Sequence, residues 1–186
     1  MHRQVGHRAI IFAQQQVVAH PRLSLVSRAR SGQLSAKRHG GEQGRTMGIL
    51  MDEETLTAFL AREFPQTADD FVIEQVDEMA IRVRMPVAER HLRPGGTVSG
   101  PSMFALADVS VYLAVLAMIG PKALAVTTNC SIDFMRKPAA GVDMICECRL
   151  LKLGRVLAVG ECLLFSEGVQ APVARASMTY SIPPER

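Results

Sequence analysis

Hydrophobic and polar positions first indicate a helix and a pair of strands. In residues 52–64 the apolar side chains Leu56, Phe59 and Leu60 fall on one helical face. Acidic residues open the segment and a proline ends it, so it predicts an amphipathic helix. Residues 71–77 and 79–86 alternate between apolar and polar side chains, with Asp77 and Glu78 between them. This alternation predicts a β-hairpin with a turn at Asp77–Glu78.

The next pattern, SMFALADVSVYLAVLAMI at residues 102–119, is apolar on nearly every side. Pro101 suits the first turn of a helix. A helix that is hydrophobic all round is either buried in a protein or placed in a membrane. Asp108 lies well inside the segment, where lipid would penalise its charge, and soluble-type strands flank it. We therefore expect a buried central helix and no membrane span.

Four β-like runs follow Gly120 and Pro121, at residues 124–135, 142–153, 155–166 and 172–182. Their connections are short, so sequential strands are expected to be antiparallel neighbours. A helix that is apolar all round needs apolar partners on most sides, and a curved antiparallel sheet wrapped around it would supply them. The pattern predicts an α+β hotdog fold, with five to six strands around one long helix, as a single domain over residues 47–186.

Residues 1–46 differ from the rest of the chain. They carry eight basic residues and one acid, a balance of +7, and their Gly/Ser-rich polar composition is typical of disorder. The composition also resembles a transit peptide. A flexible tail, or translated upstream sequence ahead of a working start at Met47 or Met51, explains the segment as well. We expect the domain itself to be cytoplasmic.

Charge and composition exclude several functions for the domain. Residues 47–186 have a balance of −4, which argues against nucleic-acid binding. They contain one histidine, His91, which argues against a histidine-based metal site. The four cysteines form no C-x-x-C motif and are expected to be reduced core residues.

Candidate chemistry centres on Asp108 and the glycine-rich turn before the helix. A carboxylate in such a helix is costly unless it is paired or hydrogen-bonded, so it is either structural or functional. The segment GGTVSGP, residues 95–101, leads directly into the helix. Backbone N–H groups at a helix N-terminus are unsatisfied donors, and Gly100 has no side chain to block approach, so its amide could polarise a carbonyl oxygen.

These residues resemble the signature of the PaaI-like acyl-CoA thioesterases, hotdog enzymes of the 4-hydroxybenzoyl-CoA thioesterase superfamily. SGPSMFALAD keeps the family's spacing, with Ser99 at the histidine position, Gly100 at the first glycine and Asp108 at the acid. VTTNCSIDFMRKPAAG is similar to a family strand with an aromatic residue shortly before a proline, and LKLGRVLAVGEC to a family hairpin. Pro101 replaces the second glycine, and Arg93 occupies a place where many members have asparagine.

The resemblance implies hydrolysis of an acyl- or aryl-CoA to the free acid and CoA by a homodimer, assembled into a tetramer as a dimer of dimers, with each site shared between subunits. Asp108 would activate water or attack as a nucleophile, Gly100 would hold the thioester oxygen, and Thr127 would assist the water. No metal or other cofactor is implied. Further residues are assigned to the acyl group and loop (His91, Arg93, Met103, Phe104 and Tyr112) and to the CoA phosphates (Arg136, Lys137 and Arg155).

Two other functions remain open on this fold. One is an enoyl-CoA hydratase or dehydratase, because HLRPGGTVSG is superficially similar to the loop of those enzymes. Their acid would fall at position 105, which is alanine here, so the spacing favours the thioesterase. The other is an acyl-CoA-binding protein without turnover, against which the presence of both Gly100 and Asp108 argues.

Overall fold

The structure, a computed structural model, describes residues 48–184, so the predictions for residues 1–46 lie outside the described part. In chain order the elements are α1 (Glu53–Glu63), η1 (Ala68–Asp70), β1 (Val72–Asp77), β2 (Ala80–Met85), η2 (Glu89–His91), β3 (Leu92–Arg93), β4 (Thr97–Val98), α2 (Gly100–Ile119), β5 (Val126–Phe134), β6 (Met144–Leu153), β7 (Leu157–Ser166) and β8 (Ala174–Ser181). Every helix and strand expected from the sequence is present.

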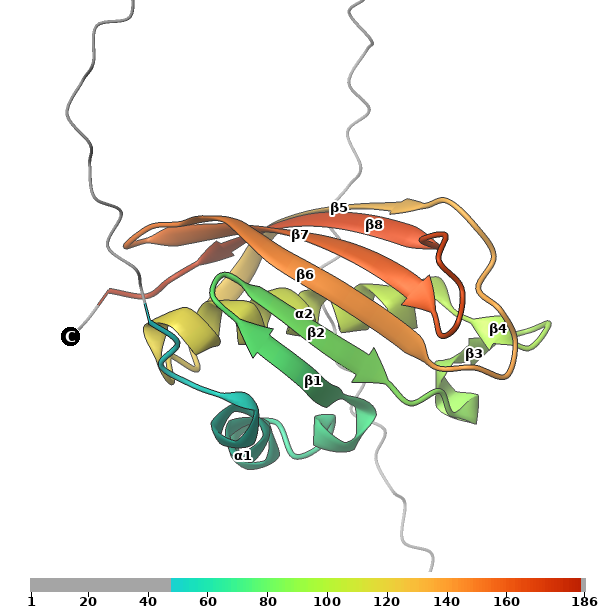
Figure 1. The fold of residues 1–186 in the computed structure, drawn as a ribbon, viewed down its shortest axis with the longest axis horizontal. Coiled ribbons are helices and arrows are strands. Elements are labelled where there is room, and N and C mark those ends of the chain that lie inside the picture. The colour runs from blue at the N-terminus through green and yellow to red at the C-terminus, as the bar shows by residue number, and fades with distance from the viewer. Residues whose placement is uncertain (1–47, 185–186) are drawn as a thin grey trace, which may run out of the picture. The chain divides into compact units, whose positions relative to one another are not determined.

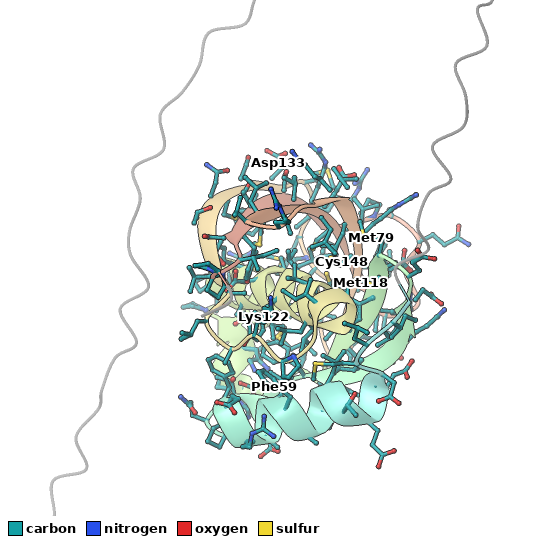
Figure 2. All side chains as sticks on the ribbon, turned by 90° about the vertical axis from the view of Figure 1, so that its left-hand side faces the viewer. Phe59, Met79, Met118, Lys122, Asp133 and Cys148 are labelled. Carbon is teal, nitrogen blue, oxygen red and sulfur yellow. The ribbon has the colours of Figure 1, made fainter. Side chains whose placement is uncertain are left out.

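The sheet has six strands in the order β1-β2-β6-β7-β8-β5, and each neighbouring pair is antiparallel. It curves around α2, which is seen end-on in Figure 2 with the strands above and to one side of it. Figure 1 shows β5 and β1 at the two edges. This is the predicted hotdog arrangement of a sheet around one long helix.

Helix α1 begins and packs as its sequence predicts. Asp52 caps it by accepting a hydrogen bond from the Thr55 N–H at 2.9 Å, and the following acids favour the positive end of the helix dipole. Its buried side chains are Leu56, Phe59 and Leu60. The Phe59 ring lies 6.4 Å from the ring of Tyr112 on α2, so α1 covers α2 on the side away from the strands (Figure 2).

Helix α2 is long and apolar enough to cross a membrane, with 20 residues and a mean hydropathy of 2.0. The folded chain itself covers it, because 67% of that stretch is buried. Its contacts come mainly from β6, β2 and β7 on the concave side of the sheet. The helix is therefore the core of the domain, as the sequence predicts.

Two local features differ from the sequence-based expectation. The turn of the first hairpin lies at Glu78–Met79, one residue later than predicted, because Asp77 pairs with Ala80. Met79 adopts a positive φ of 60° to make this tight turn. In addition, the loop before α2 contains a two-residue hairpin, β3 and β4, that the sequence pattern is too short to reveal.

Strand β7 touches α2 most closely at Gly160. A Cβ placed there would lie 2.9 Å and 3.0 Å from the two γ-carbons of Val111. We expect Gly160→Ala to lower the free energy of unfolding by about 1–3 kcal/mol through overpacking, measured by denaturant titration. Gly48→Ala is the control, because nothing lies within 4 Å of that position. The double variant Gly160→Ala/Val111→Ala should recover part of the loss, and an undiminished loss would contradict the clash.

Candidate functional site

The N-terminus of α2 presents an unused backbone donor. Ser99 is the N-cap, and its hydroxyl accepts a hydrogen bond from the Ser102 N–H at 3.3 Å. Gly100 is the first helical residue, and its N–H has no acceptor within the described residues. The amides of a first helical turn carry partial positive charge. This end of α2 can therefore receive an oxygen atom that carries or develops negative charge.

The ring of Phe134, at the end of β5, covers Gly100. A Cβ at position 100 would lie 3.3 Å from Phe134 Cζ, closer than ordinary van der Waals contact. The ring is itself 52% exposed. The glycine is thus needed for close packing, and Phe134 is an apolar wall beside the free amide that sequence reasoning did not assign to the site.

His91 holds the turn before α2 from inside. Its carbonyl accepts hydrogen bonds from the Ser99 N–H at 2.8 Å and the Ser102 hydroxyl at 3.1 Å. Its ring Nδ1 accepts from the Ala88 N–H at 3.0 Å, and Nε2 lies 3.4 Å from Asp70 Oδ1. Because the side chain is only 7% exposed, these contacts make it a structural support of the turn.

Arg93 lies in the β3–β4 hairpin and is exposed. Its Nε donates to the Thr97 hydroxyl at 3.1 Å across the hairpin. Gly95 and Gly96 make the turn with φ values of 99° and 71°, a conformation that favours glycine. The guanidinium group is therefore placed on the surface of the loop that leads to Gly100.

Asp108 is half-buried on α2, and two hydroxyl groups hold its carboxylate. The Thr127 hydroxyl donates to Oδ1, and the Tyr180 hydroxyl lies 2.7 Å from the same oxygen. Tyr180 is also 2.8 Å from the backbone carbonyl of Asp108. Burial, together with the charge of Asp108, raises the pKa of Tyr180 well above its usual value, so the phenol remains a proton donor. The structure thus brings Thr127 to Asp108, as the resemblance implies.

Within one chain, Gly100 and Asp108 are too far apart to act on one carbonyl group. Eight residues of α-helix separate them, which at 1.5 Å per residue is about 12 Å. A thioester carbon must lie within a few ångströms of both its attacking oxygen and its oxyanion donor. Both groups nevertheless lie on the less covered side of α2, where Pro101 and Ala105 are exposed.

The three residues expected to line an acyl pocket lie at different depths. Met103 and Tyr112 are buried at 4% and 6% exposure, and the Tyr112 hydroxyl donates to the Ala123 carbonyl at 3.2 Å. Tyr112 also contacts the ring of Tyr180, with 6.2 Å between centroids. Phe104 is half-buried, one turn after Gly100. Of the three, Phe104 is therefore the most accessible to a bound group.

Comparison with known proteins decides the family. The family model described as the thioesterase superfamily matches residues 95–173. A crystal structure of a protein from a Silicibacter species, provisionally named a thioesterase, is 61% identical and has a TM-score of 0.71, with 75% of this chain and 97% of that chain covered. The chain belongs to the thioesterase superfamily.

Other solved members of the thioesterase fold are more distant. Phenylacetic acid degradation protein PaaI from Thermus thermophilus, solved as a variant, is 28% identical over 64% of this chain and 99% of that chain, with a TM-score of 0.56. Zebra fish thioesterase superfamily member 2 is 20% identical over 72% of this chain and 99% of that chain, with a TM-score of 0.64, and shows the common fold. No curated protein matches the chain.

The three basic residues considered for CoA lie at opposite ends of this thioesterase. Arg136 and Lys137 follow β5 at the end that carries Phe134, and the Arg136 guanidinium donates to the Pro172 carbonyl at 2.9 Å. Arg155 lies in the β6–β7 turn at the other end of the sheet. Only Arg136 and Lys137 are therefore on the same side as the free Gly100 amide.

The cysteines of the thioesterase are free thiols, and three of them are buried, Cys146, Cys148 and Cys162. Burial is the main cause that raises the pKa of Cys146, which keeps its thiol protonated. Within residues 48–184 no group of three or more Cys, His, Asp or Glu side chains is arranged to hold a metal ion. Two hollows on the outer face of the sheet, around Arg82 and Glu147, include neither Gly100 nor Asp108.

Proposed function

We propose that the protein is an acyl-CoA thioesterase whose site forms between two copies of the chain. The observation that carries the proposal is the pairing of a free helix N-terminal amide at Gly100 with a half-exposed, hydroxyl-held carboxylate at Asp108, in a chain of the thioesterase superfamily. Each group suits one part of thioester hydrolysis. The amide binds the carbonyl oxygen as it gains charge, and the carboxylate removes a proton from water.

The chemistry balances without a cofactor. Asp108 takes a proton from water as the water oxygen bonds to the thioester carbon, and the resulting oxyanion is held by the Gly100 N–H. Collapse of that intermediate breaks the C–S bond and releases the CoA thiolate, leaving the free acid. In the alternative form, the carboxylate attacks first and water cleaves the mixed anhydride. Neither route uses a metal or a redox group.

The separation of about 12 Å within one helix is the reason to invoke a second copy. If two chains pack their α2 helices side by side and antiparallel, Gly100 of one chain lies opposite the partner's Asp108. The exposed Pro101 and Ala105 leave room for such an approach.

The edge strand β5 supports the same arrangement. Its outer edge carries no partner strand in the described chain, and Val126 and Phe134 are 55% and 52% exposed there. Unpaired edges favour addition of another strand, and a two-fold axis makes the contact self-complementary. Two copies joined at β5 would extend one sheet across the dimer (Figure 1).

Substrate binding would use both ends of the site. Phe134 and Phe104 offer apolar surface beside the Gly100 amide for the acyl group. Arg136 and Lys137 are exposed at the same end and suit the phosphates of CoA. Arg93 lies on the loop before α2 and is positioned to contact the ligand from the other side of the turn.

Complementation between two inactive variants tests the shared site. Asp108→Asn and Gly100→Pro are co-expressed with different tags, and dimers that carry both tags are purified. Such a dimer contains one site with both native groups and one with neither, so we expect about half of the wild-type rate of thiol release from acyl-CoA. Each variant alone should be inactive. Inactive mixed dimers would show that the two groups do not meet across an interface.

The same assay separates the proposal from other functions of the fold. Free thiol released from acyl-CoA by the wild-type protein indicates hydrolysis. Hydration of an enoyl-CoA without thiol release would indicate a lyase, and saturable binding with neither reaction would indicate a binding protein.

A further inference from the structure

Two hydroxyl groups converge on a single oxygen of Asp108. Thr127 donates to Oδ1 from β5, and Tyr180 approaches the same atom at 2.7 Å from β8. Within the described residues Oδ2 receives no hydrogen bond from any other side chain. The carboxylate is therefore asymmetric, with one oxygen engaged by the protein and the other left open.

The geometry of the two strands explains the convergence. Thr127 and Tyr180 are direct partners in the β5–β8 register, so their side chains point to the same side of the sheet. The register shifts between Thr127 and Asn129, which inserts an extra residue into β5. Without that bulge, the alternation set by Cys130 would turn Thr128 toward α2 in place of Thr127. Both hydroxyls are thus placed by the sheet and not by flexible loops.

Tyr180 is the more constrained of the two donors. It is 2% exposed and its ring packs against Tyr112. Its single proton has two acceptors in reach, Oδ1 and the Asp108 carbonyl. A hydroxyl in this position cannot follow the substrate, but it can hold the carboxylate in one rotamer and stabilise negative charge on Oδ1.

We propose that Tyr180 is a positioning residue that, with Thr127, fixes Asp108 through Oδ1 and leaves Oδ2 as the oxygen that meets water or the thioester. This assignment rests on the proposed thioesterase function and adds to it a residue on β8 and the identity of the reacting oxygen. Tyr180 does not touch the substrate. The other titratable side chains packed around this carboxylate are Cys130 on β5 and Cys162 on β7, whose thiol contacts the Ala107 carbonyl.

The experiment compares Tyr180→Phe, Thr127→Val and the control Thr128→Val across a range of pH. Tyr180→Phe keeps the ring and removes only the hydroxyl. We expect kcat to fall about tenfold with KM unchanged, because a hydrogen bond to a charged group is lost while no substrate contact changes. The acid limb of the pH profile should move to higher pH by about one unit, since the ionised carboxylate loses a donor. Thr127→Val should shift the limb in the same direction.

Thr128→Val removes a neighbouring hydroxyl that bonds to the Thr179 carbonyl at 3.2 Å and not to Asp108, so its kinetics and pH profile should match wild type. The proposal is overturned if Tyr180→Phe has the melting temperature, kcat and acid limb of the wild type. Should Tyr180→Phe fail to fold, an unshifted limb in folded Thr127→Val overturns it equally. Wild-type protein that releases no thiol would instead refute the proposed function, which is a separate outcome.

Discussion

Asp108→Asn is expected to lower kcat for acyl-CoA hydrolysis by about a thousandfold, the usual size of the effect when a general base or nucleophile is removed. Asparagine has nearly the same shape as aspartate, and its amide oxygen can still accept from Thr127 and Tyr180. It cannot take a proton from water or attack a carbonyl. The loss should therefore fall on kcat, while the melting temperature stays close to that of the wild type.

Asp133→Asn is the matched control for this variant. Asp133 also belongs to the Asp108-contacting strand β5, but its carboxylate lies on the outer face of the sheet with 64% of the side chain exposed (Figure 2). Its nearest basic partner is Arg175, at 4.0 Å. We expect no change in kcat from this control. Hydrolysis by Asp108→Asn within a few-fold of the wild-type rate would rule out a chemical role for the Asp108 carboxylate.

The sequence pattern was sufficient for the architecture because burial determines it. An all-apolar helix can be buried only if other elements cover it, and alternating strands with short connections can do so as one antiparallel sheet. The same reasoning identified Asp108, because a charge inside an apolar segment requires a partner. It could not identify that partner, because the pairing depends on strand register.

The neighbourhood of Asp108 shows why register limits prediction. Thr127 and Thr128 are adjacent in sequence, and only the bulge in β5 decides which of them faces α2. Tyr180 continues the inward alternation of Ala176 and Met178, so its pattern is that of an ordinary core residue. Nothing in that pattern distinguishes a tyrosine that donates to a carboxylate from one that only packs.

The loop before α2 shows a second limit. His91 was considered for substrate contact, and the structure places its ring inside, against Ala88 and Asp70. Phe134 was part of a motif but had no assigned place, because its contact with Gly100 joins segments 34 residues apart. Contacts at such separation follow from the closed fold and leave no periodic signal in the sequence.

The second large effect expected is at the amide of Gly100. Gly100→Pro should lower kcat by about a hundredfold or more, the usual loss on removing one oxyanion donor. Proline suits the first position of a helix, where the N–H has no helical partner. Ser99, at φ −77° and ψ 156°, already has the extended conformation required before a proline. The variant is therefore expected to fold.

Gly100→Ala separates the lost donor from the added bulk. Both variants introduce a Cβ about as close to Phe134 as the 3.3 Å contact allows, and the exposed ring can move by a few tenths of an ångström. Only proline removes the N–H. A much smaller loss in Gly100→Ala than in Gly100→Pro, measured as kcat at saturating acyl-CoA, assigns the difference to the amide. Equal losses would mean that crowding against Phe134 is responsible and that the oxyanion is held elsewhere.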